Sequence, residues 1–497
     1  MADSEEKQGG PAFESRTFEI TVAEEEFAET KYLTPRSSVV EPFNGCGLSG
    51  VRINKEELKK RLLVPEYLRC AIAEAVRKKE FIYDPDRHRW DGISSAPEAG
   101  IVVFVNSKSG GRHGPSLKGR LQELMGEEQV FDLSTVKPQD FLQHGLGCLE
   151  KLASLGDDCA QETRDRIRIM VAGGDGSVGW VLGSIGELLA QSGKPIPAVG
   201  VIPLGTGNDL ARSFNWGGSF PFAWKSAVKR SLSRAVSGPI CRLDSWQVVM
   251  TTNNGDKLDL PYAFKPRQQT SISQDETEDG TLSTSFVSYG GLFYNYFSIG
   301  MDAQIAYGFH HLRNKKPYLA RGPISNKMIY SGYSCAQGWF CTPFSSNPRV
   351  RGINNILQLK IKKKNCSDWE ILRIPSSVRA VVVLNLHNYA SGRNPWGHPS
   401  PSYLEKRGFV EAHPDDGLLE IFGLKEGWHT TFVMIELIKA KHLAQASAIK
   451  VELRGGRRQR AYMQMDGEPW KHPLSQNYST TIEITKVPFP SLMISGE

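Results

Sequence analysis

Two adjacent glycines, an aspartate and a third glycine stand where a short, largely apolar run gives way to a helix-like pattern. The run is Ile167–Val171, and the loop after it contains Gly173, Gly174, Asp175 and Gly176. Such a run indicates a buried strand, so the glycines occupy a strand-to-helix turn. Glycines let the backbone approach an anion closely, and the first N–H groups of a helix have no internal partner. The loop therefore predicts a phosphate-binding site.

The carboxylate of Asp175 is the unexpected group in such a loop. A negative charge beside phosphate is repulsive unless it holds a metal ion or steers a proton. Asp175 is therefore the first candidate for a functional acid. The alternative is a tight glycine-rich turn capped by an aspartate, and the glycines alone support the two interpretations equally.

Two further polar loops follow apolar runs. The residues after Ile101–Val105 begin with Asn106 and Ser107, and the run 198–202 leads into Gly205-Thr206-Gly207-Asn208-Asp209. Either loop alone could be an exposed turn. Alternating strands and helices, however, imply a parallel sheet, whose strands all end at the edge where ligands bind. We expect the three loops to converge there as a nucleotide phosphate site.

The remaining pattern changes character near residue 244. Before it, helices are expected over 54–76, 117–125, 139–155, 180–189 and 221–236, with a short strand at 130–133. After it, apolar stretches typical of strands dominate and indicate a β-rich region. We expect strands at 246–250, 285–288, 293–299, 356–361, 378–386, 417–422, 449–453 and 480–484, an exposed insertion at 266–282 and a helix at 430–445.

Size and composition limit the function classes. The chain has 497 residues, 40% hydrophobic and 23% charged, with a net charge of +6. No apolar run approaches the roughly 18 residues of a membrane span, and the acidic N-terminus is unlike a secretory signal. We expect a cytoplasmic protein that contacts membranes only peripherally. The mild charge slightly favours an anionic membrane surface and does not call for nucleic acid.

The eight cysteines are scattered and form no C-x-x-C pair, which argues against structural zinc. From these patterns we predict four segments: a disordered acidic tail (1–40), a helical extension (41–97), an α/β nucleotide-binding domain (98–238) and a β-rich domain (239–490).

Five motifs together resemble the catalytic and accessory regions of the diacylglycerol kinase family. In chain order they are Val105-Asn106-Ser107-Lys108-Ser109-Gly110-Gly111, Gly173-Gly174-Asp175-Gly176-Ser177-Val178-Gly179-Trp180, Pro203-Leu204-Gly205-Thr206-Gly207-Asn208-Asp209-Leu210-Ala211-Arg212, Tyr294-Asn295-Tyr296-Phe297-Ser298-Ile299-Gly300-Met301-Asp302-Ala303 and Met465-Asp466-Gly467-Glu468-Pro469. Ser107 stands where many members have proline. The chain lacks the zinc modules and EF-hands of many animal members, and so looks like the short plant form.

The resemblance implies a fold and a reaction. The fold is an α/β domain with a parallel sheet, similar to NAD kinase and phosphofructokinase, followed by a β-sandwich-like domain. The reaction is transfer of the ATP γ-phosphate to 1,2-diacylglycerol in membranes, which gives phosphatidate and requires Mg²⁺. The resemblance and the loops together assign nucleotide contacts to Asn106, Ser107, Lys108, Ser109, Gly110, Gly173, Gly174, Gly176, Ser177, Gly205, Thr206, Gly207, Asn208 and Asp209.

The resemblance also distributes roles among the acids. Asp175 lies beside the transferring phosphate, and Asp175, Asp209 and Asp244 are the candidate metal-ordering acids. Glu468, or else Asp466, is the candidate general base for the lipid hydroxyl. Asp466-Gly467 is also a common hairpin dipeptide. Asn295 is either a site residue or a polar strand residue whose amide is satisfied locally.

Two other functions fit the same residues. A sphingoid-lipid kinase of the same superfamily is the second enzyme reading, although the long motif ending at Arg212 and Trp180 after the signature loop favour diacylglycerol. A catalytically inactive lipid-binding scaffold is the third, and the intact acids argue against it. Basic runs at 360–364 and 454–460 are either solvated faces or contacts to anionic lipid. The oligomeric state is not readable.

Overall fold

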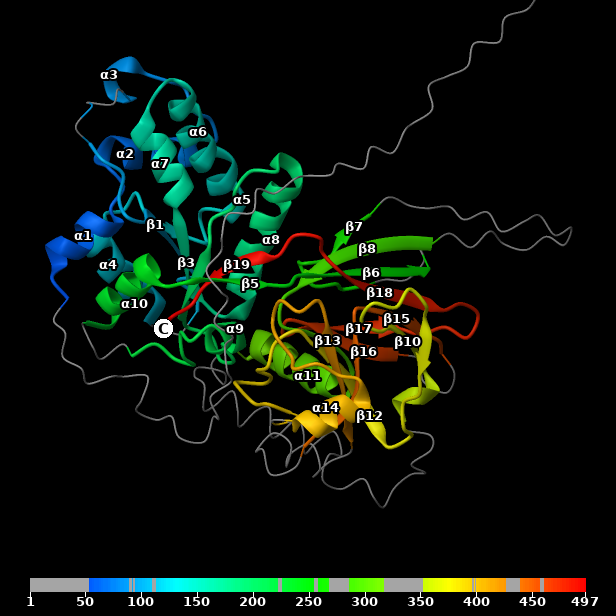
Figure 1. The fold of residues 1–497 in the computed structure, drawn as a ribbon. Helices are drawn as coiled ribbons and strands as arrows, with labels where there is room; N and C mark the ends of the chain where they lie inside the picture. Colours follow the sequence, from blue (N-terminus) through cyan, green and yellow to red (C-terminus); the bar gives the residue numbers. More distant parts are fainter. Residues whose placement is uncertain are drawn as a thin grey trace, which may run out of the picture. The chain divides into compact units, whose positions relative to one another are not determined.

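The computed structural model describes residues 53–88, 92, 94–109, 113–221, 226–253, 258–267, 286–316, 352–395, 397, 399–425, 439–455 and 460–497. Within them the strands form three sheets, in the orders β2-β1-β3-β4-β19-β5, β11-β10-β15-β18-β6-β8-β7 and β14-β13-β12-β9-β16-β17. Figure 1 shows the first sheet among the helices of the N-terminal half and the other two in the C-terminal half.

The first sheet is the predicted parallel one. Its strands β1, β2, β3 and β4 pair in parallel, and β1, β3 and β4 are neighbours in the order of the sheet. Nearly continuous apolar side chains fill these strands, as expected where helices cover both faces. The strands are β1 (Ile101–Val105), β2 (Val130–Asp132), β3 (Arg168–Gly173), β4 (Val199–Pro203), β5 (Ile240–Leu243) and β19 (Ser491–Ile494).

The helices around this sheet largely follow the expected pattern. Asn54 caps the first one, because its side chain accepts a hydrogen bond from the amide of Glu56. The helix expected at 139–155 is interrupted by a π-helical turn at Phe141–Gly145, and the sequence pattern missed α7. The helices are α1 (Lys55–Leu62), α2 (Glu66–Lys78), α3 (Pro85–His88), α4 (His113–Met125), α5 (Pro138–Asp140), α6 (Leu146–Ser154), α7 (Asp158–Arg166), α8 (Asp175–Ser192), α9 (Asp209–Ser213) and α10 (Ser226–Ser237).

The second and third sheets are antiparallel and enclose a common core, which gives the β-sandwich-like part. Large aromatic side chains fill it, with Trp246 and Trp470 almost fully buried. The second sheet contains β6 (Trp246–Asn253), β7 (Lys265–Pro266), β8 (Phe286–Phe293), β10 (Leu357–Lys362), β11 (Glu370–Leu372), β15 (Ala448–Leu453) and β18 (Thr480–Lys486); the third contains β9 (Tyr296–Gly300), β12 (Val378–Leu384), β13 (Leu419–Lys425), β14 (Lys441–Ala446), β16 (Arg460–Met465) and β17 (Glu468–Pro473).

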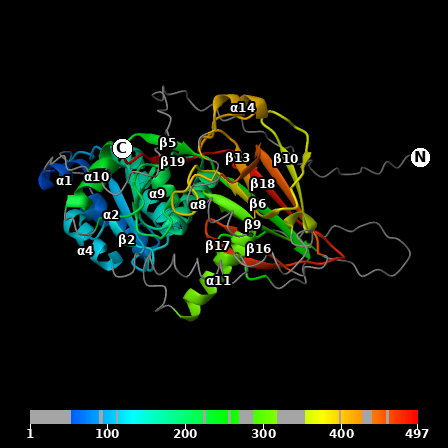
Figure 2. The same ribbon diagram turned by 90° about the horizontal axis from the view of Figure 1, so that it is seen from below.

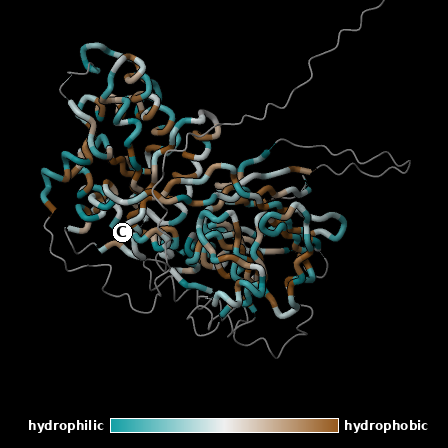
Figure 3. Tube along the Cα trace, in the orientation of Figure 1, coloured by the Kyte–Doolittle hydropathy of each residue, from teal (hydrophilic) through white to brown (hydrophobic). Residues whose placement is uncertain are grey.

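Two helices accompany these sheets in the described residues. The helix α11 (Met301–Lys315) lies along β16 and β17 (Figure 2), where Tyr307 packs on Tyr462 at 5.4 Å between ring centroids. The short helix α14 (Pro401–Arg407) begins at a serine cap, because Ser400 Oγ accepts a hydrogen bond from the amide of Tyr403. A single 3-10 turn covers Ile353–Asn355. Hydrophobic positions cluster in the interior of both halves (Figure 3).

The C-terminal strand joins the two halves. After the last accessory strand the chain returns to the first sheet as β19, which pairs with β4 in parallel and with β5 in the antiparallel sense. Trp216, just after α9, donates from its indole Nε1 to the carbonyl of Ile494 at 2.7 Å. The first sheet is therefore completed by the C-terminal strand, and the division into segments at residues 40, 97 and 238 stays a prediction.

One expected helix is wrong where the structure describes it. Residues 430–438 lie outside the described part, but Lys441–Ala446 form the strand β14, which pairs with β13 and is buried from His442 onward. Pairing with a neighbouring strand overrides the local helical pattern there. The expected insertion after Arg267 lies outside the described residues. No helix in the described ranges is long and apolar enough to cross a membrane.

Candidate active site

The three polar loops meet at the carboxyl edge of the first sheet, as predicted. Asn106, after β1, donates from Nδ2 to Ser177 Oγ on α8 at 2.9 Å. The loops after β3 and β4 touch through their backbones: a Cβ on Gly205 would lie 2.7 Å from the Cα of Gly174. Glycine is therefore required at this contact, because any side chain would push the loops apart.

The loop after β4 is held by the side chain of Asn208. Its Oδ1 accepts from the amide of Gly205 at 2.8 Å, and its Nδ2 donates to the carbonyls of Gly205 and Gly218, both at 2.9 Å. Asn208 itself has a left-handed backbone, with φ of 56°, which asparagine tolerates better than most residues. These bonds shape the loop, while the side chain of Thr206 stays exposed at its tip.

The loop after β1 is anchored to β2. Ser107 Oγ donates to Asp132 at 3.1 Å, and Lys118 pairs with the other oxygen of Asp132 at 3.2 Å. Asn106 Oδ1 accepts from the amide of Lys108 at 3.1 Å, and the Lys108 side chain points to solvent. Gly110 lies outside the described residues. The described part of this loop leaves one exposed cation, Lys108, at the edge where the loops meet.

Asp175 is the first residue of α8, and its carboxylate binds the start of another helix. Its two oxygens accept from the amides of Asp209 and Leu210, both at 3.0 Å, which are the first N–H groups of α9. Burial raises the pKa of Asp175, and these amides, together with the side chain of Asn295, oppose that rise. The acid in the signature loop thus holds the loop after β4 in place.

Asp209 is buried and receives two amides from the accessory region. Gly392 N donates to one oxygen at 2.6 Å, and Ser391 N donates to the other at 3.3 Å. Burial and the neighbouring charge of Asp175 raise the pKa of Asp209 to about 7, while these amides and Arg212 lower it. Its oxygens are therefore already engaged by protein donors.

Asp466 is half-buried, and it is both part of a hairpin turn and an acid held by backbone amides. Asp466 and Gly467 have φ of 47° and 82° and connect β16 to β17, as in a type I′ turn. Its carboxylate accepts from the amides of Tyr294, Asn295 and Tyr296 at 2.8, 2.8 and 3.0 Å. Burial nevertheless raises its pKa to about 7.

Glu468 is only two residues further on but has a different environment. It is the first residue of β17, its side chain is exposed, and no described residue hydrogen-bonds to its carboxylate. Its Oε1 would lie 3.9 Å from a Cβ placed on Gly176 in the signature loop. Partial burial raises its pKa, and the charge of Arg313 on α11 lowers it. The two halves of the chain therefore meet across Gly176 and Glu468.

Asp244, the third predicted metal-ordering acid, bonds to other partners than Asp175 and Asp209 do. It pairs with Lys486 Nζ at 2.7 Å and accepts from the amide of Gly417 at 2.7 Å. Among the described residues, no three His, Cys, Asp or Glu side chains are grouped so that they could hold a metal ion. The set Asp175, Asp209 and Asp244 does not form a cage in this part of the chain.

Asn295 is a residue whose importance the sequence left open. It is 1% exposed, its backbone amide binds Asp466, and its side chain lies close enough to Asp175 to lower the pKa of that acid. Its own side-chain oxygen has no hydrogen-bond partner among the described residues. The interpretation that its amide is satisfied locally is therefore only half correct, because one of its two polar groups is left open. The sequence signal for its importance was its position in the fourth motif, Tyr294–Ala303.

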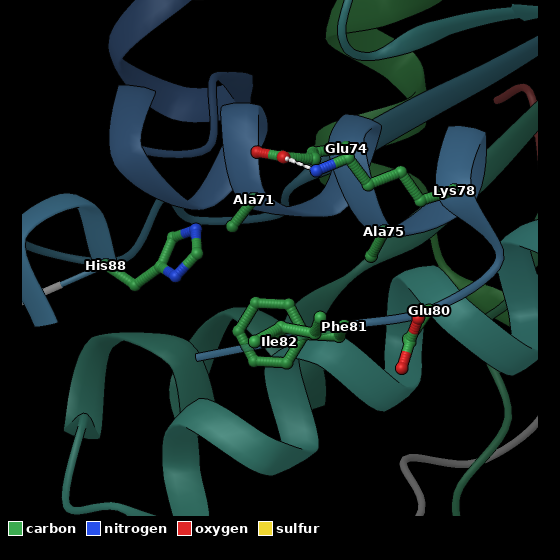
Figure 4. A pocket seen from close by; sticks show the side chains of 8 residues that line it. All are labelled: Ala71, Glu74, Ala75, Lys78, Glu80, Phe81, Ile82 and His88. Carbon is green, nitrogen blue, oxygen red and sulfur yellow. Dashed lines mark hydrogen bonds and ion pairs between the residues drawn. The ribbon is translucent and has the colours of Figure 1, made fainter. Parts of the chain in front are cut away.

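A pocket in the helical extension is unrelated to this site. It lies between α2 and the segment that follows it, and it is lined by Ala71, Glu74, Ala75, Lys78, Glu80, Phe81, Ile82 and His88 (Figure 4). Its charged residues are largely paired with each other, as in the contact between Lys78 and Glu74. None of the three phosphate loops contributes to it.

Comparison with known proteins places the chain in a family. A diacylglycerol kinase catalytic domain matches residues 100–239, and a diacylglycerol kinase accessory domain matches residues 292–469. Diacylglycerol kinase 7 of Arabidopsis thaliana is 61% identical over 91% of this chain and 94% of its own length. Diacylglycerol kinase 3 of the same plant is 57% identical over 96% and 99%, and diacylglycerol kinase 1 of Oryza sativa is 36% identical over 81% and 80%. The chain belongs to the diacylglycerol kinase family.

Proposed function

We propose that this chain transfers the γ-phosphate of ATP to the primary hydroxyl of 1,2-diacylglycerol and so produces phosphatidate. The observation that supports the proposal is the meeting of the three polar loops with a carboxylate that accepts no hydrogen bond from the described residues: Glu468 faces Gly176 of the signature loop. Phosphoryl transfer needs a positioned phosphate and a base within reach of the acceptor hydroxyl, and little covalent help from the protein. The loops would position the phosphate, and Glu468 would be the base.

The phosphates would bind to the backbone N–H groups of the three loops and to the N-terminus of α8. Asn106, Ser107, Lys108, Ser109 and Gly110 would form one wall. The other two walls would be the loops after β3 and β4, which touch at Gly174 and Gly205. The N-terminus of an 18-residue helix adds a favourable field for negative charge. The contacts assigned to these two loops are Gly173, Gly174, Gly176, Ser177, Gly205, Thr206, Gly207 and Asn208, whereas Asp209, whose amide and carboxylate are both engaged within the protein, orders the loop.

We assign the base to Glu468 and a positioning role to Asp466. Glu468 would take the proton of the lipid hydroxyl as that oxygen bonds to the γ-phosphorus and the bond from phosphorus to the ADP oxygen breaks. A raised pKa brings a carboxylate closer to the proton affinity that this step needs. Asp466 accepts three backbone N–H bonds, so its lone pairs are largely used in fixing the Tyr294–Tyr296 segment.

Magnesium fits this site as a partner of the nucleotide. Mg²⁺ is usually held by one or two carboxylates plus substrate phosphates and water, without a complete protein cage. Asp175 is half-buried at the loops, and the side-chain oxygen of Asn295, which has no partner among the described residues, is near it. These two groups would hold the ion, which supplies charge neutralisation at the phosphates. Asp209 and Asp244 are only 4% and 1% exposed, and we assign them structural roles.

The lipid substrate implies peripheral association with an anionic membrane surface in the cytoplasm. Two of the lysines in the basic run at 360–364 are engaged within the protein, since Lys363 pairs with Glu370 at 2.8 Å and Lys362 lies over the Trp369 ring at 5.0 Å. Lys360, opposite Lys450 in the β10–β15 pair, is the stronger candidate for lipid contact. Binding to vesicles with and without anionic lipid, for wild type and Lys360→Glu, tests this.

A panel of lipid acceptors tests the reaction. Purified protein is incubated with labelled ATP, Mg²⁺ and micelles that contain either diacylglycerol or a sphingoid base. Label in phosphatidate supports the proposal. Label only in the sphingoid base would replace it with the second enzyme reading, and a wild type inactive with every lipid would favour the scaffold. A parallel titration with EDTA checks the need for a divalent cation.

A further inference from the structure

The turn Ala390-Ser391-Gly392 in the accessory region has an unusual backbone. Its three residues have φ of 49°, 77° and 87°. Tyr389 and Arg393 close it by exchanging two backbone hydrogen bonds, both 2.8 Å long. A left-handed backbone is unfavourable for alanine and serine, and such strain persists only where surrounding contacts impose it. The contacts of this turn therefore need an explanation.

The turn contacts the loop Gly205–Asp209, which follows β4 and is called the nucleotide-side loop below. The amides of Gly392 and Ser391 both donate to the carboxylate of Asp209, and Ser391 Oγ donates to the carbonyl of Thr206 at 3.4 Å. Successive N–H groups that converge on one anion form a small anion-binding concavity. In this protein the anion is the carboxylate of Asp209, at the first position of α9.

The turn also packs on a cation. A Cβ placed on Gly392 would lie 2.7 Å from Arg212 Cδ, and Arg212 Nε donates to the carbonyl of Gly207 at 3.3 Å. Nearby, Asn388 Nδ2 donates to Ser213 Oγ at 2.9 Å. One strained turn thus contacts the tip of the loop after β4, the first residue of α9 and the arginine one turn later.

We infer that the turn Ala390–Gly392 is a positioning device for the ATP site: it binds Asp209 as an internal anion and thereby fixes the Gly205–Asp209 loop and the Arg212 side chain. Asp209 then anchors the loop and does not bind metal. The accessory region contributes to nucleotide binding as well as to the acceptor side. This inference rests on the proposed use of the loop for ATP phosphates, and it does not depend on which lipid accepts the phosphate.

Gly392→Ala tests the device, and Gly408→Ala is its matched control. Both glycines have left-handed backbones, with φ of 87° and 64°. An alanine at either site is therefore destabilised by a similar amount of backbone strain. A Cβ at Gly408, at the end of α14, would have no atom within 4 Å, whereas at Gly392 it would press on Arg212. Only the first substitution disturbs the contact with the nucleotide-side loop.

The readout is nucleotide affinity, measured directly by calorimetry with a non-hydrolysable ATP analogue and by the KM for ATP. Loss of a charge-assisted contact corresponds to about a tenfold weakening, so we expect Gly392→Ala to raise both quantities by about that factor. The KM for the lipid should stay within about twofold, since the device acts on the nucleotide side. Gly408→Ala should leave both ATP quantities unchanged.

Asp209→Asn keeps the test decisive where Gly392→Ala fails to fold, because it preserves shape and removes the charge. We expect it to weaken ATP binding equally at all Mg²⁺ concentrations, and the double variant to be no worse than the stronger single one. Equal effects of the two glycine substitutions, or rescue of Asp209→Asn by high Mg²⁺, would overturn the inference. Normal ATP affinity in a wild type that phosphorylates no lipid would instead reject the proposed reaction and leave the turn testable.

Discussion

The two halves of the chain contribute to the proposed active site in different ways. The first sheet presents three loops from adjacent parallel strands, and each loop is a continuous motif whose residues act together. The accessory half presents single turns that are far apart in the sequence: Tyr294–Tyr296, Ala390–Gly392 and the hairpin that contains Asp466 and Glu468. The loops of the parallel sheet converge because all its strands end at one edge, whereas the accessory turns meet because β12, β9 and β16 are antiparallel neighbours in the third sheet, so that the end of one strand lies beside the start of the next.

The acids at this junction show what the difference means. Three carboxylates are each held by backbone amides from another segment: Asp175 by the start of α9, Asp209 by the turn at 391–392 and Asp466 by residues 294–296. Glu468 has no such donors among the described residues. We propose that the amide-held acids order the loops, that Asp175 in addition serves the phosphates, and that the acid that is not held accepts the proton. The predictions below test that separation.

Asp175→Ala should have the largest effect. It removes the carboxylate at the phosphate loops and also the acceptor for the first amides of α9. We expect kcat to fall by about 10⁴-fold, at the upper end for a group that acts directly on a reaction. The unfolding temperature should fall as well, because a helix cap is worth about 1 kcal/mol. Steady-state kinetics and thermal unfolding measure the two effects.

Asp175→Asn is the control for the structural part of that loss. It keeps one acceptor oxygen for α9 and should restore most of the stability while kcat stays low. Activity that recovers together with stability would mean that Asp175 acts only as a cap, and the proposed role beside the phosphate would be lost.

Glu468→Gln should lower kcat by about 10³-fold, within the range for loss of a general base. Its unfolding temperature should stay at the wild-type value, because the side chain is exposed and accepts no hydrogen bond from the described residues. Asp466→Asn should do the reverse: it weakens three backbone contacts and costs about 2 kcal/mol of unfolding free energy. Retained activity in Glu468→Gln would move the base to Asp466.

Much of the first half could be predicted from the sequence because its signals are local. The apolar runs before Asn106, Gly173 and Pro203 predicted the strands, and alternation with helices predicted a parallel sheet, so the meeting of the loops followed. The partner of Asp175 could not be predicted in the same way. Its hydrogen bonds to the amides of α9 depend on the exact approach of two loops, which no spacing encodes.

The accessory contributions were harder to predict. The five motifs pointed to Asp466 and Glu468 but left their roles open, since only the structure shows that one accepts three amides and the other none. The turn at 390–392 carries ordinary turn residues, and its contact with Asp209 joins positions about 180 residues apart, as the bond between Gly392 and Asp209 shows. The strand Lys441–Ala446 was mistaken for a helix because its pairing with β13 is non-local.

Asn295→Asp should have a smaller effect than either acid substitution. It keeps the shape, removes the side-chain amide that lowers the pKa of Asp175 and adds a charge beside two other carboxylates. We expect kcat to fall by about 10- to 30-fold, the equivalent of one or two lost hydrogen bonds in a buried setting. The KM for ATP should change little, because the loop amides that bind phosphate are untouched.

The control for Asn295 is a buried hydrogen bond elsewhere in the accessory half. Thr252 bonds to Thr480 between β6 and β18 at 3.0 Å, and neither residue belongs to the loops or turns assigned to the site. Thr252→Val should lower stability by a similar amount and leave kcat unchanged. If both variants lower kcat in proportion to their stability, Asn295 has only a structural role.

The smallest effect should come from a substitution of Arg313. The charge of this residue acts on Glu468 from α11. Its charge lowers the pKa of Glu468, while partial burial raises it. Arg313→Gln removes the lowering contribution, so the pKa of Glu468 rises. Because the base must be deprotonated to accept a proton, the acidic limb of the kcat/KM profile should move to higher pH, while the plateau changes by less than about twofold, as for other exposed charge contacts. The shift should vanish in the Glu468→Gln background. If the limb shifts equally in the Glu468→Gln background, it reports one of the acids that accept backbone amides. Glu468 would then no longer differ in function from those acids.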